Sequence, residues 1–175
     1  ANRNFANKLW NATRFVLMNL EDDKEYKINK DELEFEDRWI ISTLNTLKEI
    51  VNKNLEHFEI GLAASAIYEF IWFKFCDWYV EFVKPRLYGE DQNRKNNALA
   101  VIQKVLSEML CLLHPFMPFI TEEIWQTLPG TAGKIMHAAF PTASEDNSYP
   151  REEKMVELAI EAITGIRNER QTRNI

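Results

Sequence analysis

The chain has 175 residues, of which 46% are hydrophobic, so it can form one domain with a large core. Its formal net charge of −6 argues against a uniformly basic surface that binds nucleic acid. Glycine and proline are scarce, at 5 and 6 residues, and the long gaps between them favour helices.

The sequence lacks the motifs of common catalytic and metal sites. It contains no glycine-rich phosphate loop and no Gly-x-Ser-x-Gly motif. The two cysteines form no Cys-x-x-Cys pair and the three histidines lack metal-binding spacing, which favours buried thiols in a reducing cytosol. No apolar run is long enough to span a bilayer, so we expect no membrane partner. We therefore expect no catalytic residue and no metal ligand.

The first twenty residues predict a helix with two different faces. A buried face is indicated by apolar residues at spacings of three and four: Phe5, Leu9, Ala12, Val16 and Leu20. A second row, here named the outer row, combines a cation, two amides and a ring: Asn4, Lys8, Asn11 and Phe15. This stretch carries three cations and no acid. Because salt screens exposed charges beyond about 8–10 Å, such a basic face can coexist with an acidic total.

Two further helices follow a polar loop over residues 21–30. Asp31 and Glu34 have the spacing of a capping box, so the second helix is expected to begin there and to end near Lys53. The third helix is predicted over about residues 59–87 and is apolar on most faces, which is typical of a helix surrounded by others. Pro85 and Gly89 are expected to end it.

The rest of the chain predicts three more helices. The fourth covers about residues 91–113 and stops before Pro115, because the residue before a proline avoids helical backbone angles. Pro118 is expected to open a short fifth helix, and residues 134–141 are expected to be extended. Pro150 opens the last helix. The pattern predicts an all-α bundle of four long helices, with a short helix, a small extended segment and a C-terminal helix.

We expect three parts: a helix bundle over residues 1–130, an extended segment and linker over 131–149, and a C-terminal helix over 150–175. Residue 1 falls inside a helical pattern that has no cap, which predicts a piece of a longer protein.

The residues of the outer row support two interpretations. In the first, Lys8 and Asn11 are simply solvated and Phe15 packs under the 21–30 loop. In the second, the ring stacks on an unpaired base, the amides contact its edge and the cation holds a phosphate. Such stacking contributes about 1–3 kcal/mol per base. Composition alone leaves both open.

Four stretches resemble the anticodon-binding helical domain of class I aminoacyl-tRNA synthetases, and within that class the valyl-tRNA synthetase family. They are RNFANKLWNATRFV at 3–16, DRWI at 37–40, FCDWYVE at 75–81 and LHPFMPFITEEIW at 113–125. The last is shared with leucyl and isoleucyl relatives, whereas the first and third look specific to the valyl family. Residues 131–149 match least, and Glu169 stands where the family has an apolar residue.

The resemblance implies the anticodon recognition module of a valine–tRNA ligase, with tRNA-Val as its partner. The complete enzyme would attach valine using ATP and Mg²⁺. The ATP-site signatures HIGH and KMSKS are absent here, so we expect no cofactor in this chain and no activity from it alone. We expect a cytoplasmic, monomeric fragment. The alternatives are the same domain of a leucyl- or isoleucyl-tRNA synthetase, and a helical protein-interaction scaffold.

The resemblance also implies roles for residues. Valine codons begin with GU, so the anticodon ends in A and C. Phe15 is expected to stack on a base, Lys8 to contact a base edge or a phosphate, and Asn11 to lie between them. Two arginines are expected to hold the RNA backbone: Arg3 and Arg14. Two more are expected to contact the tRNA stem: Arg167 and Arg170.

Overall fold

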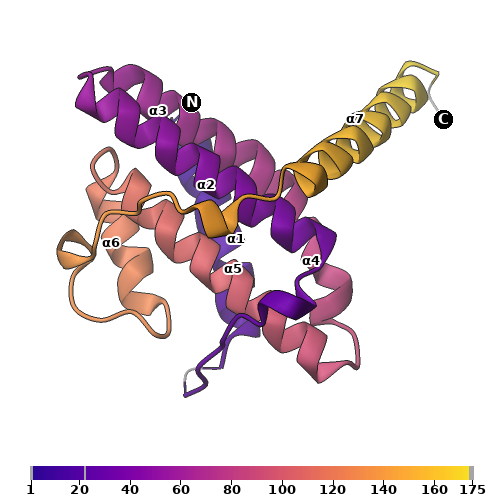
Figure 1. The fold of residues 1–175 in the computed structure, drawn as a ribbon, viewed down its shortest axis with the longest axis horizontal. Coiled ribbons are helices and arrows are strands. Elements are labelled where there is room, and N and C mark those ends of the chain that lie inside the picture. The colour runs from indigo at the N-terminus through magenta and orange to yellow at the C-terminus, as the bar shows by residue number, and fades with distance from the viewer. Residues whose placement is uncertain (1, 22, 174–175) are drawn as a thin grey trace.

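The computed structural model describes residues 2–21 and 23–173, and none of these lies in a strand. The fold is all-α, as predicted (Figure 1). Its helices are α1 (Asn2–Asn19), α2 (Phe35–Glu56), α3 (Ile60–Glu69), η2 (Phe70–Tyr79), α4 (Val80–Leu87), α5 (Gln92–Leu113), α6 (Pro118–Thr127) and α7 (Pro150–Thr172). Three short 3-10 turns connect them: η1 (Lys30–Glu32), η3 (Ile135–His137) and η4 (Glu145–Asn147).

The core lies between α1, α2, α5 and the segment from α3 to α4. The predicted inner face of α1 is buried along its whole length, from Phe5 to Leu20. Burying each large apolar side chain contributes about 1.5–3 kcal/mol. In Figure 1, α2 runs beside α3, and α5 lies below this pair. The outer row therefore belongs to a helix that is fixed from its inner side.

The predicted third helix is one continuous rod, Ile60–Leu87, built from α3, η2 and α4. Its central ten residues, η2, form a π-helix, whose hydrogen bonds span five residues instead of four. Pro85 lies inside α4 and does not end the rod, which continues to Leu87. We name this element the rod.

The second helix begins later than predicted. Asp31 lies in the 3-10 turn η1, and the capping box is formed by Glu34 and Asp37 instead. The backbone N–H of Glu34 donates to Asp37 at 3.1 Å. The reason is tertiary, because Asp37 is also the partner of a buried arginine on the rod, described below.

The remaining helix starts agree with the prediction. The side chain of Asp91 accepts from the backbone N–H groups of Asn93 and Arg94 and caps α5, and Pro118 opens α6. Lys134 and Ala138 have extended backbone angles, but a 3-10 turn lies between them.

Figure 1 shows that α7 projects away from the body of the molecule. Among the residues that the structure describes, Val156 is the one buried residue of α7. Two ion pairs hold its base: Lys74 with Glu157 at 2.9 Å, and Arg38 with Glu152 at 3.3 Å. Ile160 and Ile163 are half-buried, whereas several other apolar residues of this helix are exposed, including Met155, Leu158 and Ile166.

Candidate nucleic-acid interface

The outer row of α1 lies at the boundary between core and solvent. Lys8 and Phe15 are half-buried, whereas Asn11 is exposed. Since these residues are separated by three and four positions, they share one side of the helix. Neither the ring nor the amine is sealed beneath neighbouring helices, so the surface remains accessible.

Lys8 is held in place by two residues of η2. Its Nζ donates to Asp77 Oδ1 at 2.5 Å and lies 4.0 Å from the centroid of the Trp72 ring. The second contact is a cation–π interaction, worth about 0.5–1 kcal/mol at an exposed site. The side chains of Lys8 and Asp77 keep 25% and 41% of their surface exposed. The ammonium group therefore has a defined position and still meets solvent.

Trp72 packs in an aromatic cluster with Phe5 and Tyr68. The ring centroids of Phe5 and Tyr68 are 5.0 Å apart, and those of Tyr68 and Trp72 are 5.6 Å apart. Phe5 and Trp72 are stacked at 6.4 Å. Each such pair contributes about 0.5–1.5 kcal/mol beyond area burial, so the cluster fixes the ring on which Lys8 rests.

Phe15 forms a second contact point between α1 and the rod. Its ring packs against the core, and Lys84 Nζ lies 5.6 Å from the ring centroid. Lys84 is in turn paired with Glu81 at 2.6 Å. The ring is thus anchored on one side and remains partly exposed on the other, as a stacking platform requires.

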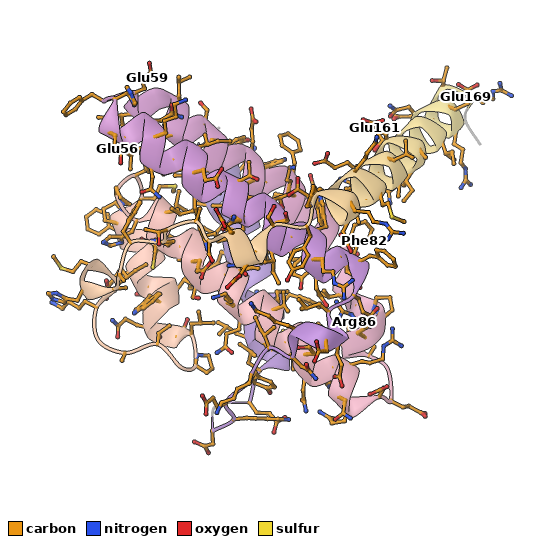
Figure 2. All side chains as sticks on the ribbon, in the orientation of Figure 1. Glu56, Glu59, Phe82, Arg86, Glu161 and Glu169 are labelled. Atoms are coloured by element: carbon orange, nitrogen blue, oxygen red, sulfur yellow. The ribbon has the colours of Figure 1, made fainter. Side chains whose placement is uncertain are left out.

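The four predicted arginines occupy different places. The Arg167 guanidinium lies 5.1 Å from the Trp78 ring, and Trp78 packs on Phe82 at 5.6 Å. In Figure 2, Phe82 lies near the start of α7. The other three are exposed and form no ion pair within residues 2–21 and 23–173: Arg3, Arg14 and Arg170. The structure brings Arg167 to the rod, whereas Arg3 and Arg14 lie on α1, the helix of the outer row, and Arg170 lies near the end of α7.

Several residues at this surface were not predicted from the sequence, and all of them come from the rod: Trp72, Asp77, Trp78 and Lys84. The available signal was that charged residues, among them Asp77 and Lys84, interrupt an otherwise apolar helix. The resemblance at 75–81 also pointed to this segment.

A buried ion pair fixes the rod against α2. Arg86 donates to Asp37 through Nη1 at 2.7 Å and through Nη2 at 2.6 Å, and Tyr79 donates to the same carboxylate at 2.9 Å. Burial raises the pKa of Tyr79 well above its usual value, and the nearby Asp37 charge raises it further. Burial alone would lower the pKa of Arg86, but hydrogen bonding to Asp37 and its charge raise it overall. This network sets the position of η2 and therefore of Asp77.

The remaining chemistry is sparse. Among the described residues, no group of His, Cys, Asp and Glu side chains is arranged to hold a metal ion. Burial raises the pKa of Cys76 to about 12 and that of Cys111 to about 11, so both are protonated thiols at neutral pH.

No helix within the described ranges is long and apolar enough to cross a membrane.

The fold and this surface define a helical bundle with an aromatic and cationic face along α1 and the rod. Residues 37–175 match the family described as the anticodon-binding domain of tRNA ligase. The chain belongs to this family, and the predicted resemblance is confirmed.

The chain is similar to curated valine–tRNA ligases over its whole length. It is 49% identical to that of Clostridium acetobutylicum over 100% of this chain. It is 50% identical to that of Carboxydothermus hydrogenoformans over 99%, and 48% identical to that of Syntrophotalea carbinolica over 99%. In each case it spans about a fifth of the relative, with 20% of that protein covered.

A solved structure of LeuRS from Agrobacterium radiobacter K84, in a ternary complex with tRNA and LeuAMS, has a similar fold. The TM-score is 0.61 with 23% sequence identity, over 85% of this chain and 17% of that one. At this identity the likeness concerns the fold alone.

Proposed function

We propose that this chain recognises the anticodon of tRNA-Val as a module of a valine–tRNA ligase. The proposal is carried by the near-50% identity to valine–tRNA ligases over the whole chain. Since the chain spans 20% of those relatives, the remaining parts would supply ATP- and Mg²⁺-dependent attachment of valine. The module alone would be inactive as a ligase and monomeric.

The outer row, which combines half-buried Lys8 and Phe15 with exposed Asn11, supports this proposal. Phe15 would stack on an anticodon base, while Asn11 and Lys8 contact its surroundings. Two exposed cations would hold the RNA backbone near α1: Arg3 and Arg14. Two further cations, on α7, would contact the stem: Arg167 and Arg170. In this arrangement residues 1–130 form the recognition bundle, 131–149 a linker and 150–175 a helix leading to other parts of the protein.

The proposal predicts that Phe15→Ala weakens binding of a tRNA-Val anticodon stem-loop by about 1–3 kcal/mol, because one stacking partner is lost. Binding of labelled RNA to the 175-residue chain is measured by fluorescence anisotropy. Circular dichroism of the variant should match that of the unchanged protein.

The matched control is Phe119→Ala, because Phe119 is 91% exposed on α6 and should leave binding unchanged. Stem-loops with leucine and isoleucine anticodons provide the comparison. Equal affinity for all three stem-loops would contradict the proposal and favour a protein-interaction scaffold. Tighter binding of a leucine or isoleucine stem-loop would assign the module to those enzymes.

A further inference from the structure

We infer that Lys8 and Asp77 form a donor–acceptor pair that reads the Watson–Crick edge of an anticodon adenine or cytosine, in a base orientation that guanine and uracil do not fit. This inference rests on the proposed function and goes beyond it, because it names the chemical feature of the base that is recognised. It also adds Asp77, which comes from η2, to the residues that determine specificity.

The two side chains retain hydrogen-bonding capacity toward solvent. A lysine ammonium has three N–H donors, and a carboxylate offers about four acceptor positions. The contact at 2.5 Å uses one donor and Asp77 Oδ1, while Oδ2 has no hydrogen-bond partner within the described ranges. With 25% and 41% of the two side chains exposed, a donor and an acceptor lie side by side at the surface.

The pair complements the Watson–Crick edges of adenine and cytosine when the ring nitrogen of the base faces Lys8 and the amino group faces Asp77. On the Watson–Crick edge, adenine presents the N1 acceptor beside the N6 amino donor, and cytosine presents the N3 acceptor beside the N4 amino donor. Lys8 can donate to the ring nitrogen while Asp77 accepts from the amino group, as carboxylates do from cytosine N4. Guanine and uracil present an N–H beside a carbonyl. If the bound RNA backbone holds these bases in the same orientation, donor would face donor and acceptor would face acceptor.

The charge of the pair argues against contact between Lys8 and a phosphate. Asp77 neutralises the ammonium at 2.5 Å, and its own negative charge repels a phosphate oxygen. The exposed cations on α1 that form no ion pair among the described residues are better suited to the backbone: Arg3 and Arg14. Of the two roles that the sequence left open for Lys8, the geometry therefore favours contact with a base edge.

The pair is also held in place before any RNA arrives. Trp72 supports the Lys8 ammonium at 4.0 Å, and the aromatic cluster beneath it holds the ring. Asp77 belongs to the rod, which the buried Arg86–Asp37 pair fixes to α2. A preformed pair pays little ordering entropy on binding and tolerates little adjustment toward a mismatched base. The last two letters of valine anticodons, A and C, both carry the amino group that it accepts.

The test uses the 175-residue chain and three RNA hairpins with the anticodons GAC, GGC and GAU. The unchanged protein should bind GAC about tenfold or more tightly than the hairpins with A→G or C→U changes, in line with the discrimination of a good bidentate contact. Asp77→Asn should reduce that preference to about twofold or less at one of the two positions, because the amide can also donate to a carbonyl.

The matched control is Glu157→Gln, which neutralises a carboxylate in another lysine pair, with Lys74 at 2.9 Å, and should keep the full preference. Asp77→Asn must also keep the circular dichroism spectrum of the parent. If it keeps the preference at both positions, the inference is wrong although the proposed function stands. If the unchanged protein shows no preference among the hairpins, the proposed function itself fails.

A second measurement distinguishes contact of Lys8 with a base edge from contact of Lys8 with a phosphate. Arg14→Ala should lower the steepness of the plot of log affinity against log salt by about one unit, which corresponds to the loss of one phosphate contact. Lys8→Ala should leave this steepness unchanged and reduce base discrimination. A Lys8→Ala slope that falls as much as the Arg14→Ala slope would place Lys8 on a phosphate and overturn the inference.

Discussion

At the scale of single residues, the ion pair between Asp37 and Arg86 is the most deeply buried pair of charged side chains among the described residues. The Asp37 side chain is 0% exposed and that of Arg86 is 3% exposed. Glu36 also lies 3.1 Å from Arg86, and burial raises the pKa of Glu36. Taking these charges out of water is costly, and only their close mutual contacts offset it.

We predict that Asp37→Ala destabilises the protein by about 3–5 kcal/mol, because it leaves the Arg86 guanidinium buried without its main partner. Urea unfolding followed by circular dichroism measures the change. Asp146→Ala, at an exposed position in η4, serves as control and should stay within about 0.5 kcal/mol. A loss below 1 kcal/mol in the Asp37 variant would mean that neighbouring glutamates compensate.

At the scale of elements, the turn between α2 and α3 contains an unfavourable residue. Phe58 has a φ of +59° and is 87% exposed. Figure 2 shows this turn between the labelled residues Glu56 and Glu59. A left-handed conformation costs a residue with a Cβ about 1–2 kcal/mol, and the phenyl ring gains no burial that would offset this.

Phe58→Gly should therefore stabilise the protein by up to about 1 kcal/mol, since glycine adopts positive φ without strain but loses more chain entropy on folding. The midpoint of urea unfolding should rise while the slope stays constant. Phe58→Ala keeps the Cβ and should change stability far less. Equal effects of both variants would show that the ring, and not the backbone, is responsible.

The sequence predicts those element boundaries that carry a local signal. Asp91 and Pro118 place the starts of α5 and α6 because capping and proline act within one turn. The start of α2 could not be chosen locally, because Asp31/Glu34 and Glu34/Asp37 both have capping-box spacing and the distant Arg86 decides between them. The π-helix η2 gave no signal because its apolar residues cover most faces.

The same reasoning separates the two halves of the candidate site. The outer row follows from the helical period of α1 and could be predicted from spacing. Asp77 and Trp72 could not be assigned to it, because their position depends on how the rod packs on α1. Partners that are distant in sequence leave no periodic trace in either segment.

At the scale of the whole molecule, α7 differs from the other long helices. Beyond its base, the Arg167–Trp78 contact joins it to the rod, and the labelled Glu161 and Glu169 lie along its projecting part in Figure 2. Segments with few buried apolar contacts open locally at low free-energy cost.

We predict that backbone amides of residues 161–172 exchange with solvent much faster than those of α5, which is largely buried. Hydrogen exchange read out by mass spectrometry resolves the two segments. Arg167→Ala should accelerate exchange in α7 further. Protection in the outer half of α7 equal to that of α5 would contradict this description.

The Lys8–Asp77 contact joins positions that are 69 residues apart in the chain. A synthetic peptide copied from α1 would carry the ring, the amide and the ammonium without the carboxylate. Under the proposed function, it would adhere to RNA through charge and stacking but would lack the acceptor that the pair offers to a base. Transplanting the proposed specificity onto another scaffold would therefore require both segments, grafted together with their mutual packing preserved.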